Sequence, residues 1–201
     1  MNSVMRIALA TSPEQLARLV ALQQAFAQVC NALAPIVQKT RCWNRVALHH
    51  MTYKSLREQF PAMGSQMVCN AIYSVSRASR MVFQSAQSPF NLTRLGAKPL
   101  PLLQFTAGCP VYFDRHTLSV KDGQLSMFTL DGRMRFQLAL DPQAETQFRE
   151  SKLREIILSR SAQGNFELSF TFSDESKDEV LPSLEENQGE IPTYVLVEES
   201  V

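Results

Sequence analysis

Apolar side chains in the first part of the chain recur with the period of an α-helix. A short apolar stretch over residues 5–10 predicts a strand. Ser12 and Gln15 then have the spacing of a capping box, and Pro13 suits the first position of a helix. The apolar positions that follow predict a helix that ends at Pro35. They are Leu16, Leu19, Val20, Phe26, Ala27, Cys30 and Leu33.

Two further helices are predicted before residue 88. One covers about 49–59 and stops at Pro61, and the other opens after Gly64 with Ser65 as its cap. In the latter helix one stripe is apolar and should face the core: Met67, Ala71, Ile72, Val75, Ala78 and Val82. The opposite side is polar and should face solvent: Asn70, Ser74, Arg77, Arg80 and Gln84.

After Ser88 the hydrophobic period falls to about two, which is typical of strands. The predicted strands cover residues 117–120, 124–130, 134–138, 156–159 and 166–172. The dipeptides between them favour tight turns: Asp122-Gly123, Asp131-Gly132 and Gly164-Asn165. A last short apolar strand is predicted over 194–197.

Helices followed by strands predict the α+β class, and the isolated first strand should join the later strands. The predicted architecture is a small OB-like, wedge-type β-barrel with a helical bundle inserted after its first strand. The barrel would comprise residues 1–10 and 90–173, and the helical lobe residues 11–88. Residues 174–201 form an acidic linker or tail.

A net charge of +1 conceals two regions of opposite charge. Residues 1–140 hold fifteen Lys and Arg against five Asp and Glu, whereas residues 174–201 hold nine acids and one lysine. A basic body attracts the phosphates of nucleic acid. The acidic tail has three open interpretations: a solubilising end, a vestigial linker, or a phosphate mimic that competes for the basic body.

Composition also excludes several classes of protein. The four cysteines, Cys30, Cys42, Cys69 and Cys109, are too far apart for a zinc ribbon and are expected to be buried free thiols. No uninterrupted apolar run approaches the roughly 20 residues that cross a bilayer, and the N-terminus is not expected to be a secretion signal. The chain is therefore expected to be cytoplasmic and not bound to a membrane.

Three stretches carry a more specific pattern. The first is Thr11-Ser12-Pro13-Glu14-Gln15 with Leu19 and Asn31-Ala32-Leu33. The second joins Leu48-His49, Tyr53, Leu56-Arg57, Gly64-Ser65-Gln66-Met67, Ala71-Ile72 and Val75. The third joins residues 113–120, 122–126 and 129–133 to the strand Phe166 to Phe172. In this order they resemble the front part of the TnpB family of transposon-encoded RNA-guided nucleases, which are relatives of type V CRISPR effectors.

The resemblance implies a wedge domain and a helical recognition lobe with the boundaries given above. In relatives these parts hold the scaffold of the guide RNA and help to read a short duplex motif beside the target. The family continues into a RuvC-like nuclease core, whose first strand ends in a catalytic Asp. Here the corresponding place is residues 194–201, with Glu198 and Glu199, and the sequence ends. The resemblance thus implies no catalytic domain, metal or cofactor, and the chain is not expected to be an enzyme.

Basic and aromatic residues are the candidates for contact with nucleic acid, because cations pair with phosphate and rings stack on bases. In the helical lobe they are Arg41, Arg45, Tyr53, Lys54, Arg57, Arg77 and Arg80. On the hairpins they are Arg115, Lys121, Arg133 and Arg135. A solvated helix face, ordinary strand polarity and core packing remain alternatives for these residues. His49 and His50 have no carboxylate or thiolate partner at a suitable spacing and are expected on a helix surface.

Three functional hypotheses follow. The first is a nucleic-acid-binding protein that holds guide-like RNA, with duplex DNA as a further candidate partner. The second is a subunit of a split nuclease, in which a nuclease-bearing chain pairs with the strand at 194–197. The third is a degenerate remnant that acts through a protein partner or binds nothing.

Overall fold

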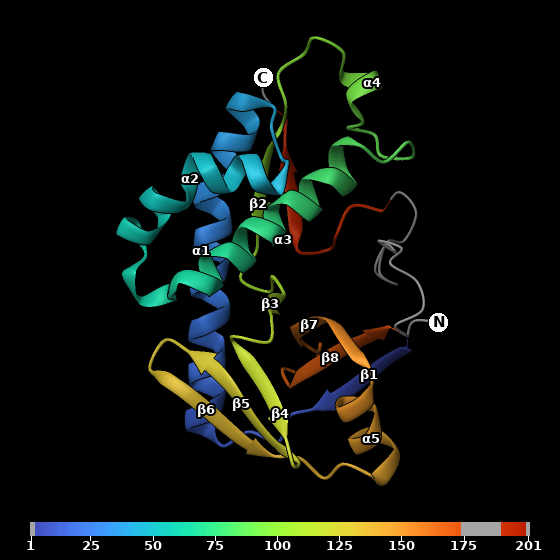
Figure 1. The fold of residues 1–201 in the computed structure, drawn as a ribbon. Coiled ribbons are helices and arrows are strands. Elements are labelled where there is room, and N and C mark those ends of the chain that lie inside the picture. Colours follow the sequence, from blue (N-terminus) through green and yellow to red (C-terminus); the bar gives the residue numbers. More distant parts are fainter. Residues whose placement is uncertain (1–2, 174–189, 200–201) are drawn as a thin grey trace. The chain divides into compact units, whose positions relative to one another are not determined.

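The structure, a computed structural model, describes residues 3–173 and 190–199, and it has the α+β fold that the sequence predicts (Figure 1). Its chain forms two compact units, Met1–Gln23 with Pro110–Glu179, and Gln24–Cys109 with Val180–Val201. The sequence placed these boundaries near residues 10 and 90. The boundaries in the structure differ from the predicted ones because one helix, α1 (Pro13–Thr40), begins in the first unit and ends in the second.

The first unit contains a four-stranded antiparallel sheet. Its strands are β1 (Ser3–Ala8), β3 (Val111–Phe113), β7 (Lys152–Arg160) and β8 (Phe166–Ser173), in the order β1-β8-β7-β3 (Figure 1). The first strand pairs with β8 from Ser3 opposite Phe172 to Ala8 opposite Glu167, as expected. Alternate side chains of β8 are buried and form the core of this sheet: Phe166, Leu168, Phe170 and Phe172.

A three-stranded sheet belongs to the same unit. Two hairpins join β4 (Leu118–Lys121), β5 (Gln124–Thr129) and β6 (Gly132–Gln137) in sequence order. Asp122 and Gly123 both have positive φ angles, 50° and 74°, which a two-residue hairpin turn of this kind requires. The predicted turn at Asp122-Gly123 is confirmed.

Helix α5 (Pro142–Glu150), which the sequence analysis missed, follows this sheet. The carboxylate of Asp141 accepts a hydrogen bond of 2.7 Å from the N–H of Ala144 and caps the helix. Phe148 packs edge-on against Phe170 and Phe172, with ring centroids 4.9 and 5.2 Å apart. These contacts anchor α5 on the four-stranded sheet.

Hydrogen bonding among the described residues joins the strands into separate sheets of four, three and two strands. The α+β class is therefore confirmed, whereas a barrel closed by continuous strand pairing is not observed between the four-stranded and three-stranded sheets. The OB-like architecture remains an interpretation.

The second unit combines helices with a small sheet. Its elements beside α1 are α2 (Arg45–Gln59), the 3-10 turn η1 (Pro61–Met63), α3 (Ser65–Phe83), α4 (Leu92–Leu95), β2 (Leu102–Phe105) and β9 (Val195–Glu198). Helix α2 begins earlier than predicted because Asn44 caps it, accepting a bond of 3.1 Å from the Ala47 N–H. Gly64, and not Ser65 as predicted, is the N-cap of α3.

The prediction that Pro35 ends the first helix is wrong. Helix α1 continues to Thr40 with Pro35 inside it, although proline removes one backbone hydrogen bond. Beyond Pro35 the side chain of Val37 is 1% exposed, and Gln38 donates a hydrogen bond of 3.1 Å to the carbonyl of Leu100. Tertiary packing therefore holds the last turn together.

By length and composition α1 is also long and apolar enough to cross a membrane, a criterion that the core helix of a soluble protein meets as well. Its most apolar 18-residue window has a mean hydropathy of 1.3, and half of that window is buried within the structure. Polar residues such as Gln23 and Asn31 interrupt the apolar run without lowering this average far. The buried side chains Leu22, Phe26 and Leu33 belong to the protein core.

The strand predicted over 194–197 is present as β9 and pairs antiparallel with β2, which the sequence analysis did not predict. On the other edge of β2, the side chain of Asn31 from α1 makes the backbone hydrogen bonds that a neighbouring strand would make. Its amide nitrogen donates a bond of 2.9 Å to the carbonyl of Phe105, and its oxygen accepts one of 2.7 Å from the N–H of Phe105. Residues 174–189 of the acidic tail lie outside the described residues.

Candidate nucleic-acid interface

The solvent side of the β4-β5-β6 sheet gathers three of the predicted contact residues. Strand register places Lys121 opposite Gln124, and Arg135 opposite Ser126, with Arg133 two residues before Arg135 on the same face. All three basic side chains are exposed. We call this surface the basic sheet face; it comprises Ser119, Lys121, Gln124, Ser126, Phe128, Arg133, Arg135 and Gln137.

Along each strand, side chains point alternately to the basic sheet face and to the inner side of the sheet, as the two-residue period of a strand requires. The buried side chains there are Leu118, Leu125, Met127, Met134 and Phe136. At the strand positions of the basic sheet face no residue is acidic, and Asp122 and Asp131 lie in the two turns. The face is thus a surface with three cations, several uncharged hydrogen-bonding groups and one half-buried ring, Phe128.

Arg133 is held in place across the strand beside it. Its Nε donates a hydrogen bond of 2.7 Å to the hydroxyl of Ser126, and its Nη2 donates one of 3.0 Å to the carbonyl of the same residue. A guanidinium has five N–H donors, so these two bonds orient it over β5 and leave others for a ligand. A cation with a fixed orientation loses less side-chain entropy when it binds a phosphate.

Arg115 lies exposed in the turn that precedes β4. Asp114 shapes this turn, because its carboxylate accepts hydrogen bonds of 3.1 Å from the N–H of His116 and 3.0 Å from the N–H of Thr117. Along the chain, Arg115 therefore lies shortly before β4, the first strand of the basic sheet face.

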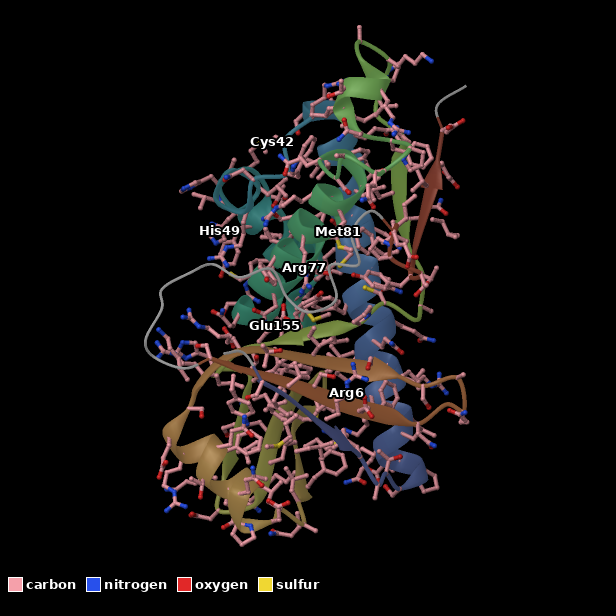
Figure 2. All side chains as sticks on the ribbon, turned by 90° about the vertical axis from the view of Figure 1, so that its right-hand side faces the viewer. Arg6, Cys42, His49, Arg77, Met81 and Glu155 are labelled. Carbon is pink, nitrogen blue, oxygen red and sulfur yellow. The ribbon has the colours of Figure 1, made fainter. Side chains whose placement is uncertain are left out.

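Helix α2 carries the second group of predicted residues. The guanidinium of Arg45 lies 5.7 Å from the ring centroid of Tyr73, and the ring of Tyr53 stacks on His49 at 4.6 Å. Lys54 is exposed, and Arg57 is half-buried. We call these residues, with Tyr73, the α2 face: Arg45, His49, Tyr53, Lys54, Arg57 and Tyr73 (His49 is labelled in Figure 2). It combines cations with rings, as surfaces that bind single-stranded nucleic acid do.

Arg77 is not a surface residue, and its assignment as a contact is corrected. On α3 (Figure 2) its side chain is only 6% exposed, and Asn70 and Ser74 of the supposed solvent stripe are also buried. The pattern was misleading because α3 is buried on more than one side: its serines are small enough to pack, and Ser76 donates a bond of 2.6 Å to the carbonyl of Trp43. Arg80 is exposed, as predicted.

Arg41 serves the fold although it is exposed. Its guanidinium donates hydrogen bonds of 2.9 Å to the carbonyl of Lys98 and 3.2 Å to the carbonyl of Gly96. Its φ of 53° ends α1 in the left-handed region. These bonds tie the end of the helix to the loop after α4, so Arg41 has a structural role that the sequence did not reveal.

The four thiols differ in burial. The four cysteines form no disulfide with one another; Cys30 and Cys109 are buried, and Cys42 and Cys69 are half-buried. Burial raises the pKa of the Cys30 thiol well above its usual value, and the neighbouring Cys109 thiol raises it further. A neutral buried thiol is a poor nucleophile. Within residues 3–173 and 190–199, no group of three His, Cys, Asp or Glu is placed to hold a metal ion.

Comparison with known protein families and with curated proteins gives no match to this chain. The resemblance to the TnpB family therefore remains an expectation that stands on the motifs alone.

Some residues of these surfaces escaped the sequence analysis. Ser119, Ser126, Phe128 and Gln137 share the face of the three predicted cations, and the two-residue alternation through 118–137 carried the signal that could have placed them. His49 was assigned to the helix surface, but its stacking on Tyr53 needs the three-dimensional geometry.

Proposed function

We propose that this protein binds RNA through the basic sheet face. The observation that carries the proposal is the clustering of Lys121, Arg133 and Arg135 on one side of a regular sheet whose strand positions carry no acid on that side. Phosphate oxygens accept hydrogen bonds from such cations, and the hydroxyl and amide groups between them add neutral donors. Phe128 offers part of a ring on which a base stacks.

The α2 face supports the same function from the second unit. Pairs of ring and cation, such as Arg45 with Tyr73, favour stacking of unpaired bases over recognition of a regular duplex. Single-stranded or looped RNA is therefore the ligand that suits both surfaces. The resemblance to wedge and recognition domains of the TnpB family points the same way and suggests a guide-like RNA, held by a wedge-type OB-like fold.

Purification from the native host at low salt tests this proposal. We expect one or a few RNA species to be enriched with the protein and to be released by high salt, because phosphate contacts displace counterions. The double variant Arg133→Gln/Arg135→Gln should carry much less of this RNA. Random RNA, or equal RNA on both proteins, would contradict binding through the basic sheet face.

The matched control for that experiment is Arg6→Gln/Lys152→Gln. Both residues are exposed on the four-stranded sheet of the same unit, on β1 and β7 (Arg6 is labelled in Figure 2). The control removes the same charge from another surface. It should therefore retain the RNA if the position of the charges matters, and lose it equally if only net charge matters.

A second candidate function, the subunit of a split nuclease, rests on β9. The N–H of Thr106 donates a bond of 2.9 Å to the carbonyl of Tyr194, and the register that follows directs the backbone groups of Val197 away from β2. Among the described strands nothing pairs with this edge, so a strand of another chain can add to it. This hypothesis predicts an adjacent reading frame for a nuclease without a front half, whose product copurifies with the chain.

A further inference from the structure

A pocket of about 320 Å³ lies in the first unit between the β4–β5 turn and α5. Val120, Leu140 and Phe148 form its apolar lining. Its volume falls at the lower end of the range for small-molecule sites and suits one nucleobase with its sugar. None of the surfaces described above accounts for this hollow.

The ring of Phe148 has a fixed position in the pocket. Its contacts with Phe170 and Phe172 are edge-on, and the half-buried Phe148 also lines the pocket. A preorganised aromatic side chain offers stacking to a flat ligand at low entropic cost. The pocket can thus hold a planar ring.

Charged side chains of both signs border the same pocket: Lys121, Asp122, Glu145 and Arg149. Two carboxylates beside two cations do not suit a site for phosphate alone, since they would repel it. Carboxylates do accept hydrogen bonds from the exocyclic amino groups of bases, as Asp and Glu do from cytosine, while Lys and Arg pair with the backbone phosphate. Taken together, the lining favours a nucleotide with an amino-bearing base.

Lys121 links this pocket to the basic sheet face, because it belongs to both. An RNA strand that lies along the face and contacts Lys121 therefore reaches a residue that lines the pocket. The turn that forms one wall is tied to the residue after β6, because the N–H of Leu138 donates a bond of 2.7 Å to the carbonyl of Gly123.

We propose that this pocket receives one unstacked base of the bound RNA and selects cytosine or adenine over uracil. Ring stacking on Phe148 holds the base, and Asp122 and Glu145 accept hydrogen bonds from its amino group. Uracil presents a carbonyl oxygen at that position, which the carboxylates repel. The inference rests on the proposed RNA binding and adds base selectivity to it.

Fluorescence anisotropy with labelled oligocytidylate and oligouridylate of equal length tests the selectivity. We expect the wild-type protein to bind oligocytidylate about three- to tenfold more tightly, because the difference in affinity comes from a few hydrogen bonds to one base. The isosteric variant Asp122→Asn/Glu145→Gln should lose this preference. Asparagine tolerates the left-handed conformation at Asp122, so the turn is retained.

The variant separates base recognition from charge. Removing two negative charges strengthens RNA binding in any electrostatic account, but only base recognition changes the ratio of the two affinities. If the variant binds both oligomers more tightly by the same factor, the pocket proposal is overturned while RNA binding stands. If the wild-type protein binds neither oligomer in a salt-sensitive way, the proposed function itself fails.

Discussion

Arg77 and Arg80 lie one turn apart on α3, and the sequence assigns them the same role. In the structure Arg77 is 6% exposed, whereas Arg80 lies on the surface. The polar stripe of α3 has the composition of a solvated face, but its members Asn70, Ser74 and Arg77 are buried in the structure. Burial of such a stripe depends on what packs against it, and the local sequence carries no signal of that.

Replacing each arginine by alanine should separate the two roles. Arg77→Ala should lower the free energy of unfolding by about 2 kcal/mol or more, because it removes packed methylene groups from a buried site. Arg80→Ala should change it by less than about 0.5 kcal/mol. Urea denaturation followed by circular dichroism measures both values. Equal midpoints for the two variants would contradict the burial of Arg77.

Among the elements, the turn signals of the hairpins were reliable, whereas the helix stop predicted at Pro35 was wrong and the pairing of β2 was not predicted. Turn residues such as Asp122-Gly123 specify their hairpins through backbone conformation, so β4, β5 and β6 could be predicted from the sequence. Helix α5 also has a local signal, Asp141 before Pro142, which was overlooked. Strand β2 could not be found this way, because it is four residues long and pairs with β9, far away in the sequence.

Asn31 tests how a helix side chain completes that small sheet. Asn31→Ala leaves the N–H and the carbonyl of Phe105 without these hydrogen bonds, and should lower the stability by about 1–3 kcal/mol. Hydrogen exchange measured by NMR should show faster exchange of the Phe105 amide in the variant. Gln28→Ala, an exposed position of the same helix, serves as the control. Unchanged protection of Phe105 would refute the role of Asn31.

On the scale of the whole molecule, the sequence predicts the exposure of the cations on the sheet better than that of the cations near the helices. The excess of cations before residue 140 is one ground for the RNA partner that we propose, and the strand period is enough to place Lys121, Arg133 and Arg135 on one face. The sequence could not reveal that Arg41 is bonded to Gly96 and Lys98, because this depends on a contact between distant segments. The positions of the cations on the sheet could be predicted from the sequence, whereas the positions of some cations near the helices could not.

The dependence of RNA affinity on salt tests the central claim most directly. We would compare the wild-type protein with Lys121→Gln/Arg133→Gln/Arg135→Gln and with the Arg6→Gln/Lys152→Gln control, on one single-stranded RNA over a series of salt concentrations. If three phosphate contacts are lost, the slope of log affinity against log salt should become shallower by about 2, at roughly 0.7 for each contact. The control should keep the wild-type slope. An unchanged slope in the triple variant would contradict RNA binding through the basic sheet face.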